Sequence, residues 1–340
     1  MFFPGAGVEI NVLQLLGMGF AVGVCSGFFG FGGGFMMTPA LNIFGFPMAY
    51  AIGTDLAQMA GSSIMSTLRH RKLGHVDLRL GLMMIAGTVV GVEAGKEVVM
   101  HMEGMGNVDT VVRWIYVALL GGLGVYMLRE ARKAAAPSVT LEEAGPHPMQ
   151  SNGLASKIKG LNIPPFMSLP VSGIPKISIW VPIGIGFLTG VLAGLLGVGG
   201  GFIRMPALVY LMGVPTVVAV GTDLFEIVIS GSYGAFTYAL ADRVELLAVA
   251  ILLVGASAGV QIGAAATRYV SSDRIRHYFA LTILLAGGAV LLKQLDATFT
   301  GLSFLGAISG PLLLGVAGAI SLLIIILFLK ARGAASRRTR

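Results

Sequence analysis

The sequence predicts an all-α polytopic membrane protein, a transmembrane helical bundle of two homologous repeats with glycine-broken half-helices and about 8–10 membrane segments. The first observation is composition: of 340 residues, 55% are hydrophobic and 11% are charged, and the mean hydropathy is +0.86. A water-soluble domain of this length cannot bury so much apolar surface, so a lipid bilayer must act as solvent. The second observation is a pattern of fifteen residues that occurs twice.

Long apolar spans supply the membrane segments. Backbone groups in hydrocarbon must be hydrogen-bonded internally, and these spans are too long for barrel strands, which favours helices. The spans lie near residues 10–29, 48–68, 77–100, 110–128, 178–197, 216–241, 245–267, 275–293 and 302–329. The first has no Lys or Arg ahead of it and no clear cleavage site, which indicates a helix rather than a signal peptide. The last contains Pro311, which would turn it into a hairpin if it breaks the helix.

The repeated pattern runs from Gly27 to Leu41 and returns from Gly194 to Leu208, with nine of fifteen positions identical. A Gly-Thr-Asp-Leu sequence follows each copy, at Gly53–Leu56 and at Gly221–Leu224. Two copies of a glycine-broken helix and a Thr-Asp pair inside apolar sequence are typical of a transporter in which half of a binding site has been duplicated.

The chain is expected to divide around a polar linker. The predicted parts are a first repeat at 8–129, the linker at 130–177, a second repeat at 178–293, a C-terminal membrane segment at 301–330 and a basic tail at 331–340. The linker is rich in Pro, Ser and Gly and lacks a helical apolar period, which predicts a largely flexible loop. Aligning the repeats also pairs Asp77 with Glu245.

The basic residues that give the chain its net charge of +7 are concentrated in 69–79, in the linker and in the tail. The positive-inside rule makes these segments cytoplasmic, so we expect a multi-pass plasma-membrane protein with a cytoplasmic linker. The first half then starts inside and crosses four times, and an even count favours parallel repeats, whereas an odd count would give inverted ones. A soluble basic face that would indicate a nucleic-acid partner is absent. The single cysteine, without a Cys/His cluster, predicts neither a structural metal nor a cofactor.

Glycines spaced four residues apart form a face on one helix of each half. Gly87, Gly91 and Gly95 align with Gly255, Gly259 and Gly263. Such faces let another backbone approach closely, so we expect one tightly packed helix at the centre of each half.

The glycine triplets begin two short stretches, about 33–46 and 200–213, that are too short to span a bilayer at 1.5 Å per residue. Half-helices at membrane depth are tolerated where they line a cavity, and their positive ends favour an anion. Two such ends would meet at the midplane around one negatively charged substrate. The alternative interpretation is that the glycines only permit a tight helix crossing.

The charged residues of the second copy differ from those of the first. Arg204 stands where the first copy has Met37 and would bind either the substrate anion or Glu226. Asp55 and Asp223 lie early in apolar helices, each after a threonine, so they are either helix N-caps or sites for a coupling proton or cation.

These considerations define a candidate site. The predicted substrate-binding residues are Gly32, Gly33, Gly34, Gly199, Gly200, Gly201, Arg204, Thr54 and Thr222. The candidates for ion coupling are Asp55, Asp223, Glu226 and Gln58, of which Gln58 and Glu226 occupy matching positions. We predict no catalytic residue and no metal ligand.

At the two glycine runs and the two Thr-Asp pairs, the sequence resembles the sulfite exporter TauE/SafE-like family of membrane anion transporters. The resemblance extends over roughly residues 10–293. It implies a secondary carrier for anions such as sulfite, thiosulfate, sulfoacetate or other sulfonates. The long linker and the extra C-terminal apolar segment depart from a compact family member and leave the helix count and regulation open.

The sequence therefore predicts a secondary transporter of small anions that works by alternating access, with Arg204 as the fixed positive charge and protons or a cation as coupling partners. A passive anion channel of the same architecture is the alternative. An intramembrane enzyme is less favoured, because Asp55 and Asp223 each follow Thr rather than the Gly of an aspartyl-protease motif. The sequence sets no oligomeric state.

Overall fold

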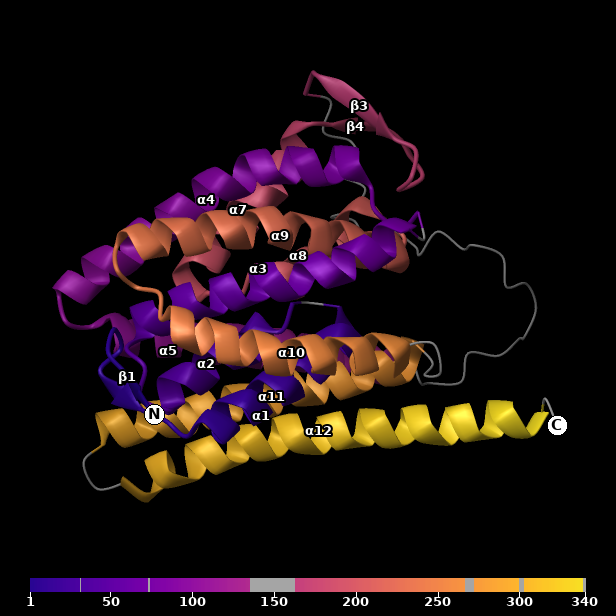
Figure 1. Ribbon diagram of the computed structural model, residues 1–340. Helices are drawn as coiled ribbons and strands as arrows, with labels where there is room; N and C mark the ends of the chain where they lie inside the picture. The colour runs from indigo at the N-terminus through magenta and orange to yellow at the C-terminus, as the bar shows by residue number, and fades with distance from the viewer. Residues whose placement is uncertain (31, 73, 135–162, 267–271, 300–302, 339–340) are drawn as a thin grey trace.

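A computed structural model describes residues 1–30, 32–72, 74–134, 163–266, 272–299 and 303–338. The long helices are α1 (Val12–Phe29), α3 (Met48–Lys72), α4 (Leu78–Gly104), α5 (Val108–Ala134), α7 (Trp180–Leu196), α9 (Thr216–Leu240), α10 (Leu246–Ala266), α11 (Ser272–Thr298) and α12 (Ser303–Arg338). They form an elongated bundle (Figure 1), and seven of them are long and apolar enough to cross a membrane. The predicted all-α polytopic fold is confirmed.

The short elements precede or follow the first helix of each half. They are α2 (Gly34–Ile43), α8 (Gly201–Pro206) with its π-helical continuation η1 (Ala207–Met212), and the antiparallel hairpins β1 (Phe2–Phe3) with β2 (Val8–Glu9) and β3 (Phe166–Leu169) with β4 (Ile174–Ser178). Glycines in the left-handed conformation end α1 at Gly30 and α7 at Gly197, and others start α2 and α8. The predicted breaks therefore occur at the glycine runs.

Each broken helix is a re-entrant hairpin. The end of α2 returns to the N-terminal strands, since the rings of Phe3 and Phe46 lie 5.9 Å apart between centroids. The end of η1 returns to the hairpin β3–β4, where Met212 and Val214 pack in one buried cluster with Leu169. Thus α1–α2 enters the bundle from one end, and α7–α8–η1 enters it from the other.

The tips of the two hairpins meet inside the bundle. A Cβ atom on Gly34 would lie 2.9 Å from the carbonyl oxygen of Gly197 and equally close to Val198. The rings of Phe35 and Phe202, just beyond the tips, are 6.4 Å apart between centroids. The two half-helices are therefore brought together from opposite ends.

Helix directions follow from which residues touch. Gly19 contacts Leu252 and Gly27 contacts Val260, so α1 and α10 run parallel. By the same test α4 runs parallel to α7 and to α9. In contrast, α3 and α9 are antiparallel, because Gly53 approaches Tyr238 whereas Gly231 approaches Ala60. Helices at matching positions of the two halves, such as α3 and α9, consequently point in opposite directions.

The halves are thus inverted, and the favoured parallel arrangement is wrong. A count of apolar spans treats the first one as a crossing, but the glycine break turns α1 and α2 back to the end at which they entered. Three long helices then traverse the bundle in the first half, α3, α4 and α5, although α3 is not among the seven apolar spans, and an odd number reverses the second half. The N-terminus therefore lies at the end opposite the linker rather than beside it.

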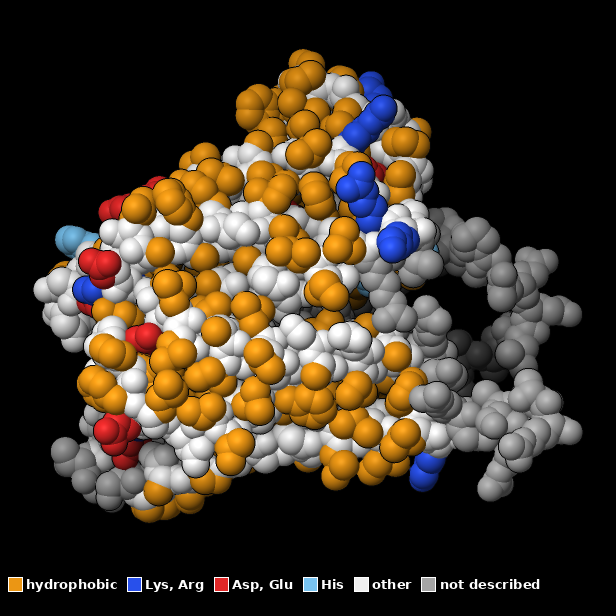
Figure 2. Space-filling model, in the orientation of Figure 1, with side chains coloured by type: hydrophobic (Ala, Val, Ile, Leu, Met, Phe, Trp, Pro, Cys, Tyr) orange, Lys and Arg blue, Asp and Glu red, His pale blue; other side chains and the backbone are white. Residues whose placement is uncertain are grey.

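The inverted arrangement gathers the basic residues at one end. Figure 2 shows Lys and Arg mostly where α4 begins and β3–β4 lies, and Asp and Glu mostly at the opposite end. Despite Pro311, α12 continues unbroken from Ser303 to Arg338, so this segment is not a hairpin. The C-terminus lies opposite the N-terminus (Figure 1), at the end where Lys72 and Lys176 are exposed.

Part of the predicted flexible linker is folded. Residues 135–162 lie outside the described residues, but 166–178 form β3–β4, which is held on the bundle by Ser172. Its backbone N and Oγ donate to Oδ2 of Asp77, at 3.2 and 2.7 Å. At the other end, the N of Gly5 donates to Oε2 of Glu245 at 2.9 Å. The aligned acids Asp77 and Glu245 thus each hold a β-hairpin over a re-entrant helix pair.

The predicted glycine faces pack backbone to backbone, and each partner helix belongs to the other half. Gly87, Gly91 and Gly95 of α4 face α7, and Gly255, Gly259 and Gly263 of α10 face α1. The two halves are therefore interlocked by α4–α7 and α1–α10. No side chain fits between these backbones without moving one of them.

Gly91→Ala tests this packing. A Cβ atom there would lie 2.7 Å from the backbone N of Val191, so we expect a loss of about 1–3 kcal/mol of stability from overpacking. Gly122→Ala is the matched control, because a Cβ atom on that helical glycine meets nothing within 4 Å. Thermal unfolding in detergent should show a lower midpoint for the first variant and an equal or higher one for the second. Equal midpoints for Gly91→Ala and the native chain would refute the close packing.

Accessibility of introduced cysteines tests the orientation. Met105 and Arg71 are exposed at opposite ends of α4 and α3, and the natural Cys25 is buried. A membrane-impermeant maleimide applied to intact cells should label Met105→Cys, whereas Arg71→Cys should react only after permeabilisation, because the positive-inside rule predicts that the basic end faces the cytoplasm. The unsubstituted protein gives the background from Cys25. The reverse labelling pattern would overturn the orientation.

Candidate functional site

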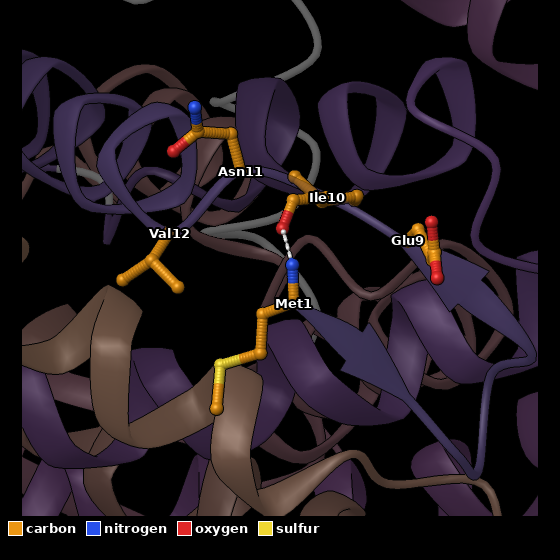
Figure 3. Close-up of a pocket in the computed structure, with 5 residues that line it drawn as sticks. All are labelled: Met1, Glu9, Ile10, Asn11 and Val12. Atoms are coloured by element: carbon orange, nitrogen blue, oxygen red, sulfur yellow. Dashed lines mark hydrogen bonds between the residues drawn. The ribbon is translucent and has the colours of Figure 1, made fainter.

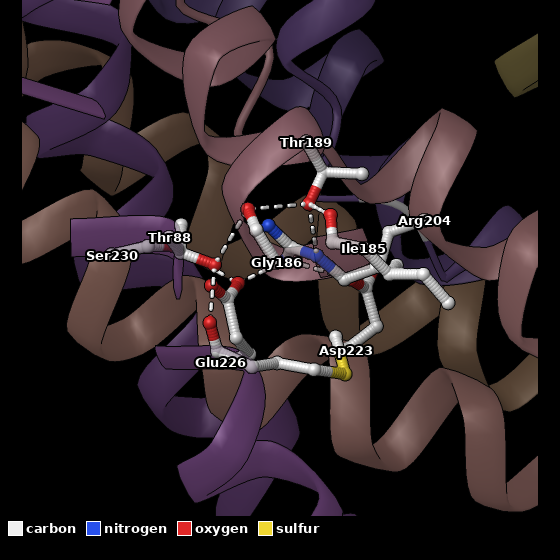
Figure 4. A network of polar contacts seen from close by, with 9 residues as sticks. Thr88, Ile185, Gly186, Thr189, Arg204, Asp223, Glu226 and Ser230 are labelled. Carbon is white, nitrogen blue, oxygen red and sulfur yellow. Dashed lines mark hydrogen bonds and ion pairs between the residues drawn. The ribbon is translucent and has the colours of Figure 1, made fainter. Parts of the chain in front are cut away.

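A fully buried ion cluster lies at the tip of the second re-entrant hairpin. Arg204 of α8 and the α9 residues Asp223 and Glu226 are all 0% exposed. Nη1 of Arg204 donates to Oδ1 of Asp223 at 3.0 Å and also to Oε2 of Glu226, and its Nε donates to Oγ1 of Thr189 on α7 at 3.1 Å (Figure 4). Three elements therefore converge on one guanidinium.

The local backbone explains why the guanidinium fits. Gly200 caps α8 with φ 74°, and its carbonyl accepts the first helical hydrogen bond from the N of Arg204 at 2.8 Å. A Cβ atom on Gly200 would lie 2.9 Å from Nη2 of Arg204 and 3.0 Å from Cβ of Thr189. Glycine at this position thus provides both the left-handed turn and the space for the arginine head group.

The cluster is incompletely satisfied. Nη2 of Arg204, Oδ2 of Asp223 and Oε1 of Glu226 are buried and lack a hydrogen-bond partner. Oε2 of Glu226 also accepts from Oγ of Ser230 at 3.1 Å. With both carboxylates ionised the cluster carries a formal charge of −1 in surroundings that solvate charge poorly.

The equivalent position in the first half has a different composition. Met37 replaces the arginine, and Gln58 replaces the glutamate. Asp55 is 0% exposed and accepts from Oγ1 of Thr38 at 2.7 Å through Oδ2, while its Oδ1 has no partner. Within the described residues, Asp55 forms no ion pair. The structure therefore has one half-site with a tethered cation and one without.

The two glycine triplets lie between these half-sites. Gly32, Gly33, Gly199 and Gly200 all have positive φ, and Gly34 and Gly201 are the first residues of α2 and α8. The side chains of Met59 and Ile227 fill the space that Cβ atoms on Gly32 and Gly199 would need. The triplets thus allow the tips to meet around two apolar side chains, and their contact with a substrate stays a prediction.

The structure turns the two threonines away from the charged cluster. Oγ1 of Thr54 accepts from the backbone N of Glu245 at 3.1 Å, and Oγ1 of Thr222 accepts from the N of Asp77 at 3.0 Å. They therefore fasten α3 and α9 to the starts of α10 and α4. The neighbouring Asp55 and Asp223 are not N-caps, because α3 begins at Met48 and α9 at Thr216, about two turns earlier.

Several polar neighbours were missed by the sequence analysis. These are Thr38 and Tyr116 beside Asp55, Thr189 beside Arg204, and Thr88 beside Glu226 (Figure 4). One signal was available: the first glycine run has Thr38 where the second has Met205, so each run carries one polar side chain, shifted by one position. Tyr116 and Thr189 come from helices outside the runs, and only the fold brings them in.

A hollow of about 450 Å³ lies elsewhere, at the N-terminal hairpin (Figure 3). It is lined by Met1, Glu9, Ile10, Asn11 and Val12, and the amino group of Met1 donates to the carbonyl of Ile10 at 2.9 Å. It is open to solvent and shares no residue with the ion cluster.

The chain belongs to the sulfite exporter TauE/SafE family, which it matches over residues 15–290. It is 26% identical to the probable membrane transporter protein YunE of Bacillus subtilis over 291 residues, covering 82% of this chain and 96% of the relative. It is 24% identical to a probable membrane transporter protein of Xylella fastidiosa over 278 residues, covering 81% and 92%. No solved structure matches the chain.

A third similarity is short. An undecaprenyl-diphosphatase of Anaeromyxobacter dehalogenans is 30% identical over 92 residues, which cover 27% of this chain and 29% of that enzyme. The family and the relatives that match most of the chain are transporters. The protein is accordingly a multi-pass membrane transporter.

Arg204→Met tests the energetics of the cluster. It leaves Asp223 and Glu226 buried without their cation, and breaking a buried pair in this way costs about 3–5 kcal/mol. We therefore expect a large drop in the unfolding temperature.

Adding Glu226→Gln to Arg204→Met supplies the control, because this pair of residues already occurs in the first half as Met37 and Gln58. The double variant should recover much of the lost stability, since one unpaired carboxylate is removed. An unchanged unfolding temperature for the single variant would show that the ion pairs are not formed.

Proposed function

We propose that this protein is a secondary transporter that moves small anions, sulfur oxyanions or organosulfonates, across the plasma membrane by alternating access. The observation that carries the proposal is the buried Arg204 at the meeting point of two re-entrant hairpins, with Nη2 still unpartnered. An ionisable side chain inside a membrane protein is expensive and usually marks a substrate or ion pathway.

The guanidinium suits such a substrate. It presents several N–H donors in a planar fork and binds oxyanions through two parallel hydrogen bonds, which a sulfite or sulfonate group accepts with two of its oxygens. The description of the family to which the chain belongs names sulfite as an exported substrate. An anion at Nη2 would compete with Asp223 and Glu226 for the same positive charge.

This competition suggests how transport is coupled. With Asp223 and Glu226 ionised, the cluster is already negative, so an added anion requires that a carboxylate take up a proton or leave the guanidinium. Anion binding and proton binding would then favour each other. The same residues would serve as the substrate anchor and as the coupling group.

The inverted fold supports alternating access. In carriers of this kind, a midplane site between broken helices opens to one side and then to the other as the repeats rock. Here the two re-entrant hairpins enter from opposite ends, and each outer end is covered by a β-hairpin. We assign the basic end, with the linker, to the cytoplasm.

Anion-dependent thermal stability tests the anion site. Sulfite, thiosulfate, sulfoacetate, taurine and carboxylates would be screened against purified protein. An anion at a concentration one hundred times its Kd should raise the unfolding temperature by about 5 °C or more, since it adds about 2.7 kcal/mol. Arg204→Lys should lose most of that shift, because an ammonium group lacks the fork that binds two oxygens.

Arg243→Lys is the matched control for this experiment. It makes the same replacement at the end of the bundle, where Arg243 pairs with Glu103, and should keep the full anion response. A response that is equal in Arg204→Lys and the native protein would place the anion elsewhere. Uphill accumulation in proteoliposomes driven by a proton gradient distinguishes the carrier from a passive channel, which shows none.

A further inference from the structure

We propose that the half-site around Asp55 binds a mobile monovalent cation, Na⁺ or H⁺, in the place that the guanidinium of Arg204 fills in the other half. The role of the cation, which is to drive anion transport, rests on the proposed function. The position of the cation site is argued from separate observations around Asp55.

The first observation is the pairing of positions between the halves. Asp55 corresponds to Asp223, but Met37 stands in place of Arg204. Both aspartates are 0% exposed, and Asp223 is paired with the tethered guanidinium at 3.0 Å. Asp55 has the same burial and no ion-pair partner among the described residues. An isolated carboxylate in such surroundings is too costly to remain ionised without a cation.

The second observation is the set of oxygens around Asp55. Its Oδ1 is buried and unpartnered, while Oδ2 accepts from Thr38. The hydroxyl of Tyr116, which lies close to the side chain of Thr38, donates to the carbonyl of Leu196. A carboxylate, two hydroxyls and a helix-terminal carbonyl are the oxygen ligands with which carriers hold Na⁺ or a proton.

The third observation is the direction of α7. This helix ends beside the half-site, since a Cβ atom on its cap, Gly197, would lie 2.6 Å from Oγ1 of Thr38. A helix C-terminus carries about half a negative charge. Asp55 therefore lies next to the negative end of α7, which opposes its ionisation unless a cation is present.

Few charged or titratable side chains near Asp55 could neutralise it in place of a bound cation. The helices α2, α7 and α10, which pack against α3, contain no charged residue. From α5 the titratable neighbour is Tyr116, and from α9 it is Tyr238, whose hydroxyl donates to the carbonyl of Gly194 at 2.6 Å. The remaining charges on α9, Asp223 and Glu226, are bound to Arg204, and on α4 Glu93 is bound to Lys96. No described cation reaches Asp55.

Occupation of this half-site would also act on the fold. Asp55 belongs to α3, Thr38 to the first re-entrant hairpin, and Leu196 and Gly197 to the tip of the second. A cation bound by these groups joins the two hairpin tips to a membrane-spanning helix. Its release would loosen the same contact between the tips that closes the centre of the bundle.

The test measures thermal stability without any candidate substrate anion. Sodium gluconate is compared with N-methyl-D-glucamine gluconate, each at pH 6 and pH 8. A cation at ten times its Kd should raise the unfolding temperature of the native protein by about 3 °C. A shift with sodium at pH 8 identifies Na⁺, and a shift with acid alone identifies H⁺.

Asp55→Asn should abolish the shift, because the amide carries no charge to compensate. Met37→Arg should abolish it as well, since a tethered guanidinium would occupy the half-site. Glu97→Gln removes an exposed carboxylate elsewhere and should keep it. If the first two variants do not fold, Thr38→Val, which removes one ligand oxygen, should weaken the apparent affinity about tenfold.

The proposal is overturned if neither cation stabilises the native protein, or if Asp55→Asn or Thr38→Val responds as the native protein does. A cation response without an anion response would leave this half-site standing and reject the anion site at Arg204. An anion response without a cation response would do the reverse.

Discussion

The arrangement of the whole bundle depends on backbone contact between the first long helix of each half and the third long helix of the other half. Along α1–α10 and α4–α7, glycines let two helices touch without intervening side chains, which in a membrane supplies packing that apolar surface alone does not. These contacts fix how deep α1 and α7 enter. They consequently fix where Gly34 meets Gly197 and where the charged side chains beyond the tips come to lie.

Burial raises the free-energy cost of any change in the pairing or protonation of the charged residues. In water, Arg204 between two carboxylates would be an ordinary ion cluster, worth little. At 0% exposure each change of partner or proton has a large cost, so the cluster favours a few defined states. The unequal half-sites, one with a tethered cation and one without, give the bundle two chemically different centres.

The helices, the glycine breaks, and the positions of Arg204 and the two aspartates could be predicted from the sequence, because all of these follow from composition and repetition. The inverted orientation of the two halves could not. Whether Gly30 to Gly34 interrupts a crossing or turns it back depends on contacts with Gly197 and Val198, residues far away in the chain. For the same reason Tyr116 and Thr189 escaped notice: each is a single polar residue in an apolar helix until the fold places it beside a charge.

The threonines show how the centre and the ends are connected. Thr54 and Asp55 are adjacent on α3, yet one side chain binds the start of α10 and the other faces the first half-site. On α9, likewise, Thr222 binds the start of α4, and the next residue, Asp223, binds Arg204 in the second half-site. Neighbouring residues of a helix move together, because the backbone between them is held by helical hydrogen bonds. A displacement of α9 that separates Asp223 from Arg204 therefore also strains the contact of Thr222 with Asp77. Since Asp77 in turn accepts from Ser172 of β3–β4, a series of hydrogen bonds connects the part of α9 that carries Asp223 to the cover at one end of the bundle.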